Sequence, residues 1–85
     1  MSGNQIEIIV VVNGQPVTLK ANLNAPLKTV VVHALNQSGN SGQPPENWEL
    51  RDAGGQVLDL NKKVEDYGIS AGAKLFLALK AGVGG

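Results

Sequence analysis

The chain has 85 residues, 42% of them hydrophobic, and carries seven basic and seven acidic side chains and no cysteine. This length holds one domain, and a domain of this size buries only about 60% of the surface that its unfolded chain exposes, so its core is small. The even charge argues against binding to nucleic acid or an anionic membrane, and without cysteine the chain has no disulfide, thiolate metal site or nucleophilic thiol.

The first residues, 1–5, are small and polar, which predicts a disordered N-terminal tail. The apolar run that follows, 6–12, contains Glu7, and no basic residue precedes it. It therefore resembles neither a signal peptide nor a membrane-spanning segment. We expect a cytoplasmic protein.

A β-hairpin is the first predicted element. Residues 6–12 are β-branched except for Glu7, Asn13-Gly14 follows, and apolar residues alternate with polar ones over 17–21. Asn-Gly is the favoured pair for a two-residue type I′ turn, because both positions need a positive φ. Pro16 lacks a donor that an edge strand can spare, so we place the second strand at the edge of the sheet.

A helix is predicted next. Asn24 is a suitable cap and Pro26 suits the first turn, where a missing N–H costs nothing. The apolar residues that fall on one helical face are Leu27, Val30, Val31 and Ala34. The β-branched run 30–32 favours a strand, but cap, proline and spacing agree on a helix that stops by about Gly39.

The C-terminal half contains two more predicted strands, 48–52 and 74–80, with an irregular stretch between them and a tail of small residues, 81–85, after them. Strand alternation and helix spacing predict which side chains form the core. The predicted core consists of Ile6, Ile8, Val10, Val17, Leu19, Leu27, Val30, Ala34, Leu50, Leu58, Val64, Ile69, Leu75 and Leu77.

This order of elements resembles the ubiquitin family from Ile6 onward. Pro44-Pro45-Glu46 is similar to the family's segment after the helix, 64–69 to its tyrosine loop, and 75–80 to its leucine-rich last strand, and the chain ends in Gly84-Gly85. The resemblance implies an α+β fold of the β-grasp (ubiquitin-like) type, with a mixed sheet of four to five strands packed on one helix. The domain would span 6–80, between the tails 1–5 and 81–85.

The resemblance also implies a function as a protein modifier. In the family, an E1-like activating enzyme uses ATP to adenylate the C-terminal carboxylate, here that of Gly85. The acyl group passes as a thioester to an E2-like conjugating enzyme and then to an amine or hydroxyl of a target protein or of another copy, and a protease removes it. Gly84 and Gly85, which lack Cβ, would fit a narrow enzyme cleft. The chain itself would be no enzyme, with no catalytic residue, metal or bound cofactor, and His33 is expected to be a solvated surface residue.

Several residues depart from the family. Arg51 stands where ubiquitin has the exposed isoleucine at the centre of its main binding patch, and Lys80 is followed by Ala81-Gly82-Val83 instead of basic residues. Ubiquitin receptors and activating enzymes should therefore not recognise this chain, and its enzymes should be dedicated ones. The sequence is more similar to prokaryotic ubiquitin-like proteins than to eukaryotic modifiers.

The outer face of the predicted sheet is the expected surface for partner enzymes or for a second copy. Its centre is apolar and its rim is charged, with Phe76 as the anchor and Arg51 as the specificity residue. The residues assigned to this surface are Ile9, Val11, Glu49, Arg51, Phe76, Ala78 and Lys80. The Ser2 hydroxyl is a candidate acceptor for another copy's Gly85, although a disordered tail without a role is the favoured interpretation of residues 1–5.

Two other functions fit the same sequence. A sulfur carrier of the thiamin or molybdopterin type shares the β-grasp fold, the diglycine end and the adenylation step, but forms a terminal thiocarboxylate. A non-conjugated interaction domain would carry the glycine tail only as a flexible end. The proline pair and the tyrosine loop favour the modifier over the sulfur carrier, and the diglycine end combined with this order of elements favours it over a merely flexible tail.

Overall fold

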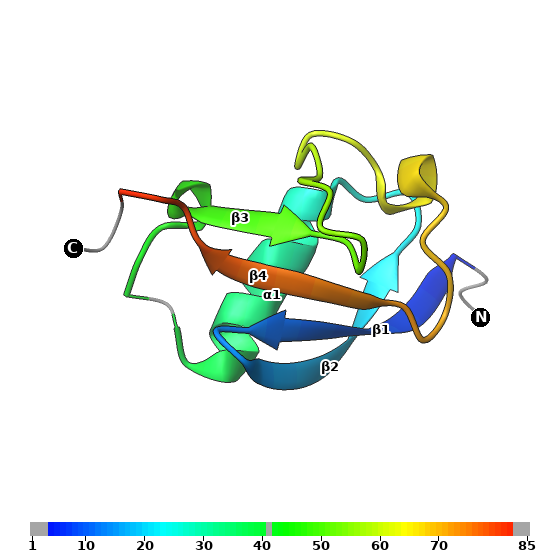
Figure 1. Ribbon diagram of the computed structural model, residues 1–85. Helices are drawn as coiled ribbons and strands as arrows, with labels where there is room; N and C mark the ends of the chain where they lie inside the picture. The colour runs from blue at the N-terminus through cyan, green and yellow to red at the C-terminus, as the bar shows by residue number, and fades with distance from the viewer. Residues whose placement is uncertain (1–3, 41, 83–85) are drawn as a thin grey trace.

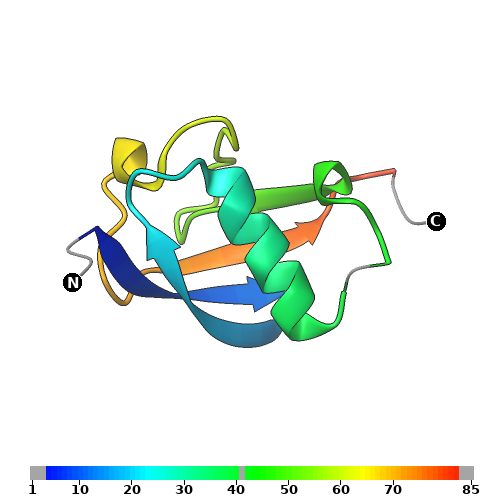
Figure 2. The ribbon, with the colours of Figure 1, turned by 180° about the vertical axis from the view of Figure 1, so that it is seen from behind.

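The computed structural model describes residues 4–40 and 42–82 of the chain. Its described part is a four-stranded sheet with one α-helix lying across one face, which leaves the other face without a covering layer (Figures 1 and 2). The elements in chain order are β1 (Gln5–Val12), β2 (Gln15–Asn22), α1 (Leu27–Ser38), a 3-10 turn (Pro45–Asn47), β3 (Trp48–Arg51), a second 3-10 turn (Val64–Tyr67) and β4 (Lys74–Leu79). This confirms the predicted mixed sheet on one helix.

The hairpin forms as predicted. Asn13 and Gly14 both have positive φ, 49° and 85°, and Val12 lies opposite Gln15, so the turn has two residues. A two-residue turn makes its closing pair a hydrogen-bonded one, so the next residue, Pro16, has its nitrogen facing away from β1. The strand order β2-β1-β4-β3 puts β2 at the edge, where that missing donor breaks no ladder.

The last strand, β4, occupies the middle of the sheet. It runs parallel to β1, with the Ile9 N–H donating to the Ala73 carbonyl at 2.9 Å, and antiparallel to β3. The first and last strands of the chain are therefore neighbours, and β3 lies outside them (Figure 1). Because β4 has a strand on each side, the end of the chain leaves the sheet from its centre.

Helix α1 begins later than predicted. Pro26 is its N-cap, in extended conformation (φ −68°, ψ 149°), and Asn24 does not cap the helix. The reason is tertiary: the first N–H groups, of Leu27 and Lys28, donate to the carbonyls of Lys62 and Leu60, at 2.8 and 3.1 Å. These bonds satisfy donors that a side-chain cap would otherwise serve. The predicted end is correct, since the helix stops at Ser38 and Gly39 follows in the left-handed conformation (φ 76°).

The segment before β4 contains the tyrosine loop. The Tyr67 hydroxyl oxygen accepts a hydrogen bond from the Asp59 N–H at 2.8 Å, and the Asp66 carboxylate accepts one from the Lys63 N–H at 2.9 Å. The first bond has the form that the family resemblance implied for a tyrosine packed against nearby backbone. These two bonds tie an irregular stretch to itself, so that it holds a fixed shape beside the sheet.

The core lies between α1 and one face of the sheet. Its buried residues are Ile8, Val10, Val12, Leu19, Ala21, Leu27, Val30, Val31, Ala34, Leu35, Trp48, Leu50, Leu58, Val64, Leu75 and Leu77. Three predicted core residues, Ile6, Val17 and Ile69, are only partly buried and pack against its margin. Ile6 lies near the start of β1, Val17 lies on the edge strand β2, and Ile69 lies outside the strands and helices, so less of the sheet and helix covers these side chains. The residues that the prediction left out are Val12, Ala21, Val31, Leu35 and Trp48.

Candidate functional site

The uncovered face of the sheet carries a row of four side chains, one from each strand. Val11 of β1 is paired with Pro16 of β2 on one side and with Phe76 of β4 on the other, and Phe76 is paired with Arg51 of β3. Paired residues point to the same face of a sheet, so the row crosses its whole width. The strand register therefore places three of the predicted surface residues, Val11, Phe76 and Arg51, in one row, and it adds Pro16 to that row.

The neighbouring rows complete this surface. Ile9 lies between Thr18 and Lys74, and Ala78 lies beside Glu49. We call the set formed by Ile9, Val11, Pro16, Phe76 and Ala78 the sheet-face patch. Arg51, Glu49 and Lys74 lie at its rim.

Phe76 is the largest apolar side chain of the patch and is 39% exposed. Ala78 is also exposed, whereas Val11 and Ile9 are half-buried. The burial pattern along β4 alternates, with Leu75 and Leu77 buried, and confirms that Phe76 points away from the core. An aromatic ring placed on half-buried aliphatic neighbours is a common centre for a protein contact.

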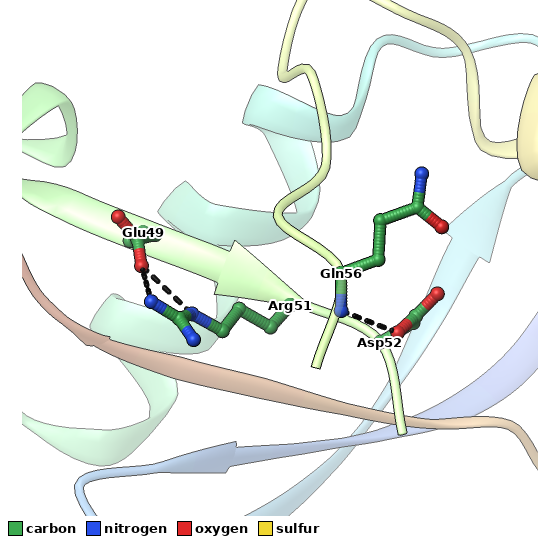
Figure 3. Close-up of polar contacts among 4 residues, drawn as sticks. All are labelled: Glu49, Arg51, Asp52 and Gln56. Carbon is green, nitrogen blue, oxygen red and sulfur yellow. Dashed lines mark hydrogen bonds and ion pairs between the residues drawn. The ribbon is translucent and has the colours of Figure 1, made fainter. Parts of the chain in front are cut away.

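The charge at the rim is held in place by a neighbour on the same strand. The Arg51 Nε donates to Glu49 Oε2 at 2.7 Å, and a second guanidinium nitrogen contacts the same oxygen (Figure 3). The Arg51 side chain is 52% exposed, so this pair contributes little to stability. What the contact does is orient the guanidinium along β3 next to Phe76.

The turn after β3 has its own fixed polar contacts. Asp52 Oδ1 accepts hydrogen bonds from the N–H groups of Gly54 and Gln56, both at 2.9 Å. Figure 3 shows the second of these bonds beside the Glu49–Arg51 pair. An Asp side chain that bonds the backbone two residues on stabilises a turn, so these contacts explain the turn rather than a binding role.

Lys80 lies next to this surface rather than within it. It follows the end of β4, and its N–H donates to the Asn47 carbonyl at 2.9 Å, directly before β3. Its side chain is exposed, as are Ala81 and Gly82 after it. This hydrogen bond is the last one along the described chain that ties it to the body.

Three of the predicted site residues, Ser2, Gly84 and Gly85, lie outside the described residues, so their roles stay predictions. His33 is exposed on α1, as predicted. Within residues 4–40 and 42–82, no three His, Asp or Glu side chains are grouped so that they could hold a metal ion. No helix of that part is long and apolar enough to cross a membrane.

Sequence reasoning missed two features of the site. Pro16 was assigned only to the sheet edge, although the Asn13-Gly14 turn fixes the register that puts it beside Val11. Val57 is the most exposed large apolar side chain of the described part, at 52%, and it bridges to Arg51 beyond the edge of β3. No periodic pattern in the sequence marks that position.

The fold is similar to that of several solved structures. A designed protein based on ubiquitin superposes with a TM-score of 0.80, at 21% identity, over 98% of each chain. The ubiquitin of Caldiarchaeum subterraneum superposes with a TM-score of 0.76, at 25% identity, over 95% of this chain and 99% of that one. The chain therefore has a ubiquitin-like β-grasp fold.

The particular family is set by sequence. The chain belongs to the family described as "Protein of Unknown function (DUF2604)", whose model matches residues 1–85. A relative from Sinorhizobium fredii (strain NBRC 101917 / NGR234), described as "Uncharacterized protein y4jI", is 53% identical over 81 residues. Those residues make up 95% of this chain and 62% of that protein, so this chain spans less than two thirds of its relative's length.

Proposed function

We propose that this chain is a ubiquitin-like protein modifier that is attached to its targets through the Gly85 carboxylate. The observation that carries the proposal is the way the fold presents the end of the chain. The last strand lies inside the sheet, between β1 and β3 (Figure 1). Lys80 makes the last bond to the body within the described residues, and Ala81 and Gly82, which follow it before Gly84-Gly85 in the sequence, are exposed.

The chemistry needs nothing from the domain except this carboxylate. An activating enzyme lets a Gly85 carboxylate oxygen attack the α-phosphate of ATP, which releases pyrophosphate and leaves an acyl-adenylate. An enzyme cysteine displaces AMP to give a thioester, and an amine or hydroxyl of the target then displaces the thiol. Where a longer precursor is made, a protease must first cut after Gly85.

The sheet-face patch supplies the second part of the proposal, because enzymes that handle the tail must also hold the body. Phe76 is its anchor, and Arg51, fixed by Glu49, sets which partners fit. The bacterial relative agrees with a prokaryotic modifier system. A partner surface with Arg51 at its rim would exclude receptors that require an apolar residue at that position.

The direct test is the intact mass of the protein isolated from its native cells. A modifier gives an isopeptide or ester adduct, a sulfur carrier gives a terminal thiocarboxylate, and an interaction domain gives an unmodified carboxylate. Each product has a different mass. The proposal is abandoned if only the unmodified or the thiocarboxylate form is found under conditions in which the protein is functional.

A second test uses the tail itself. Deleting Gly84-Gly85, or changing Gly85 to Phe, should abolish adduct formation and leave the unfolding midpoint unchanged, since every buried residue of the core precedes Lys80. The deletion also identifies the attachment site, because adducts that persist without the diglycine must form through another group. Such persistence would contradict the proposed role of Gly85.

A further inference from the structure

The outer edge of β3 carries a hollow that is separate from the sheet-face patch. It has a volume of about 300 Å3, and its lining is mainly apolar. Its walls include Glu46, Trp48, Val57, Leu58, Leu60 and Lys80. The hollow therefore lies between β3 and the irregular chain that follows it, near the point where the C-terminal residues leave the body.

Trp48 in this wall has an unused hydrogen-bond donor. The side chain is buried, at 2% exposed, yet its indole Nε1–H has no partner, and no other side-chain nitrogen or oxygen in the described part is buried without one. Buried donors are nearly always paired, because leaving one unpaired costs free energy. The free domain thus keeps a donor in position that an incoming acceptor could satisfy.

The backbone at the same place is a partly open sheet edge. The hydrogen bond from Lys80 to the Asn47 carbonyl sets the alternation along β3, so the backbone groups of Trp48 and Leu50 face away from β4. Two of these groups are already used, because the Trp48 N–H donates to the Pro45 carbonyl and the Leu58 N–H donates to the Leu50 carbonyl at 2.8 Å. No described strand continues the sheet beside the Trp48 carbonyl. Open edges of this kind accept extended chain segments.

The charges around the hollow indicate which kind of hydrogen-bond acceptor a ligand would present there. Glu46 and Lys80 have opposite charges at the rim, and the charge of Glu49 is taken up by Arg51. The rim is therefore balanced, which favours an uncharged acceptor such as a peptide carbonyl over a carboxylate. Exposed Val57 and half-buried Leu60 add an apolar wall that fits an aliphatic side chain.

We propose that this hollow binds an extended segment of a partner protein, with an aliphatic side chain against Val57 and Leu60 and a backbone carbonyl that accepts from the Trp48 indole. The indole nitrogen is covered in the free domain, so the side chains around it must shift for the acceptor to reach it. The site does not depend on conjugation, so it can be present whether or not Gly85 is activated.

The chain contains a single tryptophan, so one indole N–H resonance reports on the site directly. The probe is N-acetyl-leucine N-methylamide, which carries an aliphatic side chain and two neutral carbonyls. We expect it to shift the indole resonance saturably, with a dissociation constant on the order of 10 mM, as befits so small a ligand. N-acetyl-leucine, with its carboxylate, should bind more weakly.

Two exposed valines supply matched variants. Val57→Ser, which removes the apolar wall at a residue 52% exposed, should weaken binding by about fivefold. Val32→Ser, at a residue 39% exposed on α1 and outside the hollow, should change nothing. An indole resonance that stays fixed at about 50 mM probe, five times the expected dissociation constant, overturns the proposal.

Three other outcomes would also overturn it. Equal weakening by both valine variants would mean that the probe binds elsewhere. Tighter binding of the carboxylate would contradict a neutral peptide ligand. A water-exchange cross-peak at the indole that no probe displaces would show that the donor is satisfied by a buried water molecule only.

Discussion

Arg51 and Phe76 lie opposite each other on β3 and β4, and the arginine is held there by Glu49. The apolar centre of the sheet face therefore meets a fixed cation at the position where ubiquitin carries an isoleucine. An arginine that is already oriented loses less conformational freedom when a partner binds it than a free one would.

Changing Phe76 to alanine should weaken partner binding without unfolding the domain. Because the ring is 39% exposed and faces away from the core, we expect the free energy of unfolding to fall by less than about 1 kcal/mol. Partner binding should weaken by at least about 1–2 kcal/mol. Urea unfolding measures the first quantity, and the yield of adduct in native cells reports the second.

Val32→Ala on α1 is the control for this variant, because Val32 is equally exposed and lies on the opposite layer. Adduct yield should be unchanged in the control. If Phe76→Ala unfolds the domain, the ring is part of the core; if both variants behave alike, the partner contacts another surface.

Changing Glu49 to glutamine tests how much the Glu49–Arg51 ion pair contributes to stability, because the two side chains have nearly the same shape. The carboxylate charge is lost, so Arg51 keeps at most a neutral partner. Because the Arg51 side chain is 52% exposed, we expect a change in unfolding free energy of less than about 1 kcal/mol, and less still at high salt. A double-mutant cycle with Arg51→Gln measures the pair energy, and a coupling above about 2 kcal/mol would contradict this reading of an exposed pair.

Truncating Leu77 to alanine should cost about 2–5 kcal/mol of unfolding free energy, a large share of the stability of a small domain. Leu77 is 1% exposed at the centre of β4. Leu79→Ala, on the same face but only partly buried, should cost less. Urea unfolding of the two variants side by side checks the difference, and a Leu77 loss below about 1 kcal/mol would mean that the strand faces are wrongly assigned.

Much of this fold could be predicted because its signals are local. The Asn13-Gly14 turn fixes the hairpin register, alternation along β4 separates Leu77 from Phe76, and Gly39 ends the helix. The start of the helix could not be predicted this way. Its first N–H groups are satisfied by carbonyls of Leu60 and Lys62, more than thirty residues on in the chain, and Asn24 offered a local cap that the fold does not use.

The predicted core is too small because the alternation of inward and outward side chains extends to the ends of the strands. Trp48 is two residues before Leu50 and faces the same side, so the period that placed Leu50 inward also places Trp48 there. Its unpaired indole and the hollow beside it, in contrast, could not be predicted from the sequence. They depend on how the irregular chain around Val57 and Leu60 packs against the edge of β3, which no sequence pattern reports.

Changing Tyr67 to phenylalanine should loosen the loop before β4. The hydroxyl oxygen that accepts from the Asp59 N–H is lost, and since water can reach this bond the cost should be only about 0.5–1 kcal/mol. Amide hydrogen exchange gives the sharper measurement: the Asp59 N–H should exchange faster, while the Ile9 N–H, bonded within the sheet, should not change. Unchanged exchange at Asp59 would show that the bond does not hold the loop.

The last prediction concerns Ser2 as an acceptor for the Gly85 of another copy. Strand β1 begins at Gln5, one residue before the predicted start, and the Asn4 carbonyl accepts from the Leu23 N–H at 2.6 Å. A deletion that tests the acceptor must therefore keep Asn4 and Gln5 and remove only residues 2 and 3. That variant should unfold at the same urea concentration as the intact chain, since the bonds from Asn4 onward are retained.

If the Ser2 hydroxyl accepts the acyl group, the deletion abolishes polymers in native cells, and Ser2→Ala does so as well, because it removes the oxygen and leaves the backbone in place. Ser2→Thr keeps a hydroxyl and should retain polymers, which separates loss of the acceptor from a general effect of altering the N-terminus. Polymers that persist in Ser2→Ala would assign the linkage to an amine, either the N-terminus or a lysine, or to another hydroxyl. Mass mapping of the branched peptide then identifies which one, and an intact protein that forms no polymer at all rules out Ser2 as an acceptor.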